Sequence, residues 1–137
     1  MKFRGRRLTD LAFLGTRMLG FGDGEVSPAV VGFLGQMITS TPIEVVARFG
    51  QALLLCDKRD SLATLGRVPV TVLVGEKDRL IAPRLGIELA MDIPASQLIW
   101  VPGGGHALIL ECPGLVNEAI TAMLARVGAG GDLPRSA

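Results

Sequence analysis

Tyrosine is absent from the 137-residue sequence, and one tryptophan and five phenylalanines bring the aromatic content to only 4%. Histidine occurs once, as His106, and the two cysteines are Cys56 and Cys112. Neither cysteine has the spacing of a metal ligand, and two thiols in apolar contexts exclude a disulfide-rich secreted scaffold. We therefore expect free thiols in a reducing cytoplasm, with no metal and no cofactor.

Charge is scarce and nearly balanced, with 14 basic and 13 acidic residues and a formal net charge of +1. Apart from Arg4, Arg6 and Arg7 there is no cluster of like charge, which excludes the basic surface that nucleic-acid binding requires. Hydrophobic residues make up 49% of the sequence, a large share for one domain of this length. We interpret the excess as surface that strands outside this sequence would cover.

No uninterrupted apolar run is long enough for a membrane span, which needs roughly 20 predominantly apolar residues. The stretch 26–43 carries no charge, but Pro28 and Pro42 are among the residues that interrupt it. The basic N-terminus resembles the start of a signal peptide, yet Asp10 and Arg17 break the apolar region that should follow. We predict a cytoplasmic protein without a membrane span.

Two apolar runs with a helical pattern between them predict a βαβ unit. Residues 70–74 and 98–101 are short and uncharged, as strands covered on both faces of a parallel sheet are. Pro83 can open a helix through its fixed φ, and apolar residues recur at four-residue spacing after it. The recurring residues are Leu85, Leu89 and Ile93. The pattern predicts an α/β fold with a parallel strand pair and a crossover helix.

Asp78 follows the first predicted strand by four positions, and His106 follows the second by five, after the glycines at 103–105. Parallel strands end at the same rim of a sheet, so both side chains are expected at the carboxyl edge, where open α/β sheets place their chemistry. A carboxylate beside an imidazole can fix its tautomer and stabilise it when it takes a proton. The spacing therefore predicts a general-base pair.

The segments VTVLVGEKDRLIAP at residues 70–83 and VPGGGHALILECP at residues 101–113 resemble the last third of the α/β-hydrolase superfamily. In that family the acid follows one late strand and the histidine follows the last one, after the nucleophile. The resemblance implies that Asp78 is the acid and His106 the base. It also implies a fold whose C-terminal helix, opened here by Pro113, closes the sheet, and a small-molecule ester as substrate.

The family's nucleophile elbow, G-x-S-x-G, does not occur in this sequence. None of the five serines has glycine two positions before and two after it. Cys112 is excluded because Pro113 has no N–H to offer an oxyanion, and Asp23 lacks both the flanking glycines and a preceding strand. The HG-type oxyanion loop is missing too, because the one histidine is already assigned.

The N-terminal half is predicted to be helical. Helices are expected over residues 8–19, over residues 27–38 with Ser27 as N-cap, and over residues 41–56 from a capping box at Thr41 and Glu44. The glycine-rich residues 20–24 are expected to form a flexible turn rather than a dinucleotide fingerprint, since no strand precedes them.

By resemblance, residues 1–66 form a helical lid, residues 67–127 the C-terminal βαβα part of the core, and residues 128–137 a flexible tail. The apolar lid side chains either line an acyl pocket or pack helix on helix, and we favour packing. They are Phe33, Leu34, Met37, Phe49 and Leu53. Trp100, Met37, Met91 and Met123 are expected in the core. Asp57 and Asp60 are expected in solvent or at a helix cap, and Glu76 is a weaker candidate acid than Asp78.

Two functions from different classes fit these patterns. The first is the lid and C-terminal part of an ester-cleaving hydrolase that is inactive alone, its N-terminal part missing through truncation, a split gene or a misplaced start. It predicts that the DNA just upstream encodes an HG loop and a G-x-S-x-G elbow. The alternative is a non-catalytic interaction module that self-associates or pairs with another chain through the exposed strand at residues 70–74.

Overall fold

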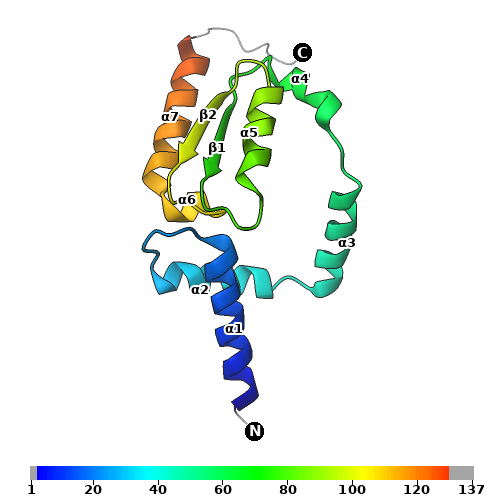
Figure 1. Ribbon diagram of the computed structural model, residues 1–137, viewed down its shortest axis with the longest axis vertical. Helices are drawn as coiled ribbons and strands as arrows, with labels where there is room; N and C mark the ends of the chain where they lie inside the picture. The colour runs from blue at the N-terminus through cyan, green and yellow to red at the C-terminus, as the bar shows by residue number, and fades with distance from the viewer. Residues whose placement is uncertain (1–2, 130–137) are drawn as a thin grey trace.

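The structure is a computed structural model that describes residues 3–129. Helices precede, separate and follow two strands (Figure 1). In chain order the elements are α1 (Phe3–Gly20), α2 (Pro28–Thr39), α3 (Ile43–Leu54), the 3₁₀ turn η1 (Arg59–Ser61), α4 (Leu62–Leu65), β1 (Thr71–Gly75), α5 (Pro83–Asp92), β2 (Gln97–Val101), α6 (Leu108–Glu111) and α7 (Pro113–Ala129).

The βαβ unit has the predicted topology. Strands β1 and β2 pair in parallel, with Val72 opposite Leu98 and Gly75 opposite Val101. Helix α5 connects them and packs on β1 so closely that a Cβ at Gly86 would lie 2.6 Å from a methyl group of Val74. In Figure 1, α5 lies beside β1 and α7 beside β2. The predicted α/β class and both strand positions are confirmed to within one residue.

The buried core is small and draws its residues from both strands, from α2, α6 and α7, and from the loops after α1 and α5. Among the described residues, its hydrophobic members are Phe21, Val31, Val74, Ile93, Val101, Leu108 and Ala119. Val74 and Val101 are strand residues near the carboxyl ends of β1 and β2. Part of this core therefore lies at the end of the sheet at which Asp78 and His106 emerge.

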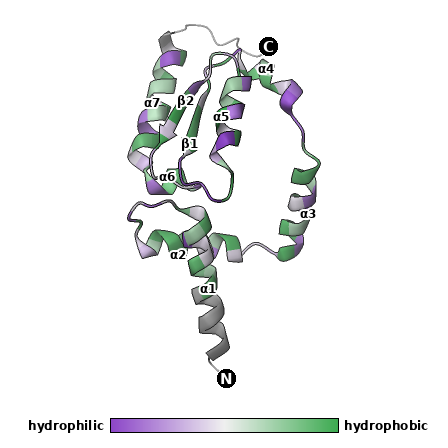
Figure 2. Ribbon diagram, viewed as in Figure 1, coloured by the Kyte–Doolittle hydropathy of each residue, from purple (hydrophilic) through white to green (hydrophobic). Residues whose placement is uncertain are grey.

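Several side chains predicted to be buried are exposed. Helix α3 has an apolar face, yet it buries none of its residues, and Phe49 is 68% exposed. Figures 1 and 2 show α3 apart from the other helices, with hydrophobic residues along it. Trp100 is 42% exposed, and Met37, Met91, Phe33 and Leu53 are exposed as well. These predictions were wrong because no described element packs over those faces.

The helix boundaries confirm the predicted caps in part. Ser27 caps α2 by accepting a hydrogen bond from the Ala29 N–H at 3.3 Å. The predicted capping box at Thr41 is wrong: α3 begins at Ile43 without a side-chain cap, and the Thr41 hydroxyl instead donates to the Met37 carbonyl at the end of α2. Helix α1 begins five residues earlier than the predicted Leu8. The Asp57 carboxylate accepts the Arg59 N–H at 3.0 Å at the start of η1, whose N-cap residue is Lys58.

Within the described chain no single helix has both the length and the apolar character of a membrane span. Helices α2 and α3 have that length and apolar character only when they are taken together, and they meet at a bend of 87°. Most of the predicted C-terminal tail, residues 130–137, lies outside the described residues.

Candidate active site

The side chains of Asp78 and His106 meet at the carboxyl edge of the sheet. Asp78 lies in the turn after β1 and His106 in the glycine loop after β2, and Oδ2 of the aspartate is 3.0 Å from Nδ1 of the imidazole. The Asp78 side chain is 14% exposed and the His106 side chain 42%. The parallel pairing of β1 and β2 accounts for this juxtaposition, because it brings both following loops to one rim.

Asp78 is fixed by its own turn before it reaches the histidine. Its Oδ1 accepts hydrogen bonds from the N–H groups of Leu80 at 2.9 Å and Ile81 at 2.8 Å, which leaves Oδ2 for His106. Burial alone would raise the pKa of Asp78. The hydrogen bonds from Ile81, His106 and Leu80 and the nearby imidazole charge together outweigh this effect, so the pKa lies below its ordinary value. The carboxyl group is therefore ionised at neutral pH.

The ionised carboxylate determines which nitrogen of His106 carries the proton. A carboxylate can only accept hydrogen bonds, so Nδ1 must be the donor in the neutral ring. The lone pair of Nε2 is then available, and the ring is partly exposed to solvent. This is the arrangement in which an imidazole can take a proton at Nε2 while a buried carboxylate stabilises the resulting charge.

The lowered pKa of Asp78 predicts a pH-dependent effect of the Asp78→Asn substitution. The ionised carboxylate stabilises the folded chain above its ordinary pKa of 3.8, and that contribution is lost as the pH falls through the lowered value. The difference in unfolding free energy between wild type and Asp78→Asn should thus be largest near neutral pH and shrink as the pH falls below about 4. Urea denaturation across pH measures it, and a constant difference down to about pH 3 would contradict the prediction.

The turn that carries Asp78 and the loop that carries His106 are joined by backbone hydrogen bonds. The Lys77 N–H donates to the Gly104 carbonyl at 2.7 Å, and the Glu76 N–H to the Val101 carbonyl at 3.0 Å. The Glu76 carboxylate accepts the Gly103 N–H at 2.9 Å. Gly103 has φ +70°, which favours glycine. Glu76, the weaker candidate acid, thus stabilises the histidine loop and does not contact the imidazole.

Residues 20–24, which we call the exit loop of α1, pack against the histidine loop. The Gly20 carbonyl accepts the Ala107 N–H at 2.7 Å, and the Asp23 N–H donates to the Gly103 carbonyl at 2.9 Å. This segment was predicted to be a flexible turn. It does end a helix as predicted, but its contacts to a loop more than 80 residues away hold it in place.

A hollow of about 220 Å³ lies beside the Asp78–His106 pair. Its lining consists of Leu73, Val74, Gly75, Asp78, Ile81, Ala82, Pro83, Gly86, Gly105, His106 and Leu108. No hydroxyl, thiol or amine side chain is among them, so this hollow offers the pair no nucleophile. The Sγ atom of Cys112 donates to the Leu108 carbonyl at 3.3 Å instead.

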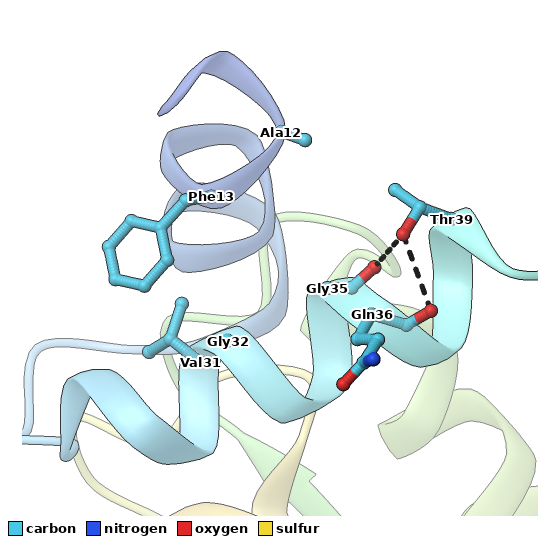
Figure 3. Close-up of a pocket in the computed structure, with 7 residues that line it drawn as sticks. All are labelled: Ala12, Phe13, Val31, Gly32, Gly35, Gln36 and Thr39. Atoms are coloured by element: carbon cyan, nitrogen blue, oxygen red, sulfur yellow. Dashed lines mark hydrogen bonds between the residues drawn. The ribbon is translucent and has the colours of Figure 1, made fainter. Parts of the chain in front are cut away.

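A larger hollow of about 540 Å³ lies between α1 and α2 and shares no lining residue with the first. Figure 3 shows Phe13 of α1 over Val31 of α2 on one side of it. The Thr39 hydroxyl bonds to the carbonyls of Gly35 and Gln36 on its own helix. This hollow contains no titratable group, whereas the smaller one is lined by the hydrogen-bonded Asp78 and His106, and we place the candidate chemistry there.

Residues outside the predicted pair also contribute to the site. The sequence analysis gave Glu111 no role, yet its carboxylate accepts the N–H groups of both Gly22 and Gly105 at 2.9 Å. The glycine clusters at 20–24 and 103–105 were the available signal, because glycine often marks close backbone approach. Within residues 3–129 no group of three or more potential metal ligands is present.

Comparisons with known proteins point to one family. A family model described as alpha/beta hydrolase family matches residues 2–119. A thermophilic esterase from Thermogutta terrifontis, whose structure has malate bound, is 31% identical and matches with a TM-score of 0.62, covering 89% of this chain and 48% of the esterase. Rv0554 from Mycobacterium tuberculosis is 30% identical with a TM-score of 0.42, covering 47% of this chain and 24% of its own. No curated protein matches.

The chain spans 48% and 24% of the lengths of these two solved proteins. The family model, in contrast, covers well over half of the 137 residues and includes the strands, the acidic turn and the histidine loop. From this match we conclude that the chain belongs to the alpha/beta hydrolase family.

Proposed function

We propose that Asp78 and His106 are the acid and the base of a carboxylic-ester hydrolase site, and that residues outside these 137 supply the attacking group. The observation that carries the proposal is the 3.0 Å contact between Asp78 Oδ2 and His106 Nδ1 at the carboxyl edge of the sheet. The absence of a G-x-S-x-G elbow from the sequence supports the second part of the proposal.

The chemistry follows from the free lone pair of His106 Nε2. As a hydroxyl oxygen attacks the ester carbonyl carbon, Nε2 takes the hydroxyl proton, and Asp78 stabilises the imidazolium. Collapse of the tetrahedral intermediate breaks the bond to the alkoxide, which leaves with the proton from Nε2. A water molecule then attacks the acyl group and gives its proton to Nε2. The carboxylic acid is released, and the proton from Nε2 restores the free hydroxyl.

The substrate class is a small-molecule ester. Family membership and the similarity to a thermophilic esterase over 89% of this chain support it. In this proposal the helical residues up to 66 form the lid, and residues 67–127 form the C-terminal part of the core. The exposed apolar face of α3 supports such a role, because a lid helix turns one face toward a pocket that other parts of the enzyme complete.

The purified 137-residue chain alone is expected to hydrolyse p-nitrophenyl acetate no faster than buffer. Its sequence contains the proposed base but neither the family's nucleophile elbow nor its HG-type oxyanion loop, and each oxyanion donor contributes roughly 10²–10³ in rate. Spectrophotometric assay of wild type beside His106→Ala measures this. Turnover that is above background in wild type and absent from His106→Ala would show that the chain contains an attacking group that we have not identified.

The proposal itself is tested in a chimera. The matched segment of the Thermogutta terrifontis esterase is replaced by the corresponding residues of this chain, so that the esterase supplies the remaining half of the fold. Ester hydrolysis by the chimera that depends on both Asp78 and His106 supports the proposal. A folded chimera with activity indifferent to both residues would contradict it.

A second function is favoured by the open edge of β1. The Gln97 N–H donates to the Val70 carbonyl and the Glu76 N–H to the Val101 carbonyl. Because backbone groups point to alternate sides along a strand, the N–H and C=O groups of Thr71 and Leu73 point away from β2. Within the described chain β1 pairs only with β2. Such an edge can pair with another strand, and pairing of this kind is the activity that a non-catalytic interaction module would have.

Sedimentation at micromolar concentration tests this alternative. Self-association that persists in Asp78→Asn and His106→Ala would favour the interaction module, because neither residue lies in β1. A stable monomer would argue against self-pairing through β1.

A further inference from the structure

We propose that Glu111 is a positioning residue for the Asp78–His106 pair, and that it acts by fastening the exit loop of α1 to the histidine loop. The proposal rests on the proposed function for the pair. It assigns residues 20–24 a partner that their glycines alone do not identify.

The Glu111 carboxylate joins two backbone segments that are remote in sequence. One oxygen accepts the Gly105 N–H and the other accepts the Gly22 N–H, both at 2.9 Å. Glu111 is half-buried at the end of α6, which directly follows the histidine loop. Hydrogen bonds to an ionised acceptor in partly buried surroundings are stronger than neutral ones. The carboxylate is therefore a strong link between positions 22 and 105.

The backbone N–H groups on either side of His106 are both held. Glu111 holds the Gly105 N–H, and the Gly20 carbonyl holds the Ala107 N–H at 2.7 Å. Because its two neighbours are fixed, His106 itself has little backbone freedom. The direction in which its imidazole leaves the loop is thus set by the exit loop together with Glu111.

The same exit loop also contacts the neighbour of Asp78. One guanidinium nitrogen of Arg79 donates to the Phe21 carbonyl at 3.4 Å, and another pairs with Asp23 at 3.2 Å. That ion pair is half exposed and contributes little stability on its own. Its relevance is positional, since the exit loop is bonded to residues adjacent to both members of the pair. Movement of the exit loop would displace the acid and the base together.

The geometry requires a carboxylate at position 111. Two N–H groups approach its two oxygens from different segments, and a glutamine offers one acceptor only, so its NH₂ group would face an N–H donor. This close approach also requires glycine at position 105, because a Cβ there would lie 2.8 Å from Glu111 Oε1. Glu111→Gln is consequently a nearly isosteric change that removes one of the two links.

The experiment uses the full 137-residue chain and NMR of its single histidine. Wild type is expected to show one low-field resonance from the His106 Nδ1 proton bonded to Asp78, and Asp78→Asn should lose it. Glu111→Gln should lose or broaden this resonance while far-UV circular dichroism stays that of a folded chain. The matched control is Glu88→Gln on α5, where Glu88 pairs only with Arg84 at 3.7 Å in the described chain; its spectrum should match wild type.

A folded Glu111→Gln with an unchanged His106 resonance would overturn the proposal. If that variant does not fold, amide hydrogen exchange in wild type decides. The Gly22 and Gly105 amides should then exchange far more slowly than the Gly24 amide of the same loop, which has no acceptor among the described residues. Equal rates would overturn the proposal. Neither readout needs turnover, so failure here and failure of the proposed esterase function are separate results.

Discussion

His106→Ala should lower kcat/KM of the chimeric esterase by about 10⁴-fold or more, the order of loss seen when the base of a hydrolytic triad is removed. The expected loss follows from the role of Nε2, since without the imidazole the proposed acceptor for the proton of the attacking hydroxyl is missing. Asp78→Asn should cost a comparable factor, because an amide can offer its NH₂ group to Nδ1 and hold the wrong tautomer. Initial rates on p-nitrophenyl acetate measure both.

The control for this prediction is Glu88→Gln, which changes charge on α5 without touching either residue. It should leave kcat/KM within a few-fold of the parent chimera. If His106→Ala retained a tenth of the parent activity, His106 would not be the base, and the 3.0 Å contact with Asp78 would have to be structural.

Gly22→Ala should lower the free energy of unfolding by about 3 kcal/mol, a large value for the addition of one methyl group. A Cβ at position 22 would lie 2.0 Å from the Gly103 carbonyl oxygen and 2.7 Å from backbone atoms of Gly104 and Gly105. All of these are backbone atoms, so no side chain can turn aside to make room. The exit loop would have to leave the histidine loop.

Gly50→Ala in α3 is the matched substitution for this comparison. A Cβ there meets nothing within 4 Å, and alanine is favoured over glycine in a helix interior by up to about 1 kcal/mol. Gly50→Ala should therefore be neutral or stabilising in urea denaturation followed by circular dichroism. Equal stability of Gly22→Ala and wild type would show that the two loops do not pack as described.

The strands and the meeting of Asp78 with His106 were predictable because each depends on short-range patterns. Uncharged β-branched runs specify strands covered on both faces, and the helical segment that begins at Pro83 forces a parallel crossover. Parallel strands then place the loops that follow them at the same edge of the sheet. This is why residues 28 positions apart could be placed at one rim from spacing and order alone.

Contacts between remote segments were not predictable. The Glu111 link to Gly22 joins positions 89 residues apart, and no periodicity relates a half-buried carboxylate to a particular glycine N–H. Burial failed for a different reason. Apolar periodicity in α3 correctly predicts a face that prefers to be covered, but whether another element covers that face depends on neighbours that local pattern does not reveal.

The half-exposed position of Trp100 on β2 makes the chain its own optical reporter. With no tyrosine and one tryptophan in the sequence, intrinsic ultraviolet fluorescence comes essentially from this single indole, which is 42% exposed at the surface of β2. Any partner segment that shields the indole from water should shift its emission to shorter wavelength. Docking onto the sheet can thus be titrated in real time without a label or a substrate.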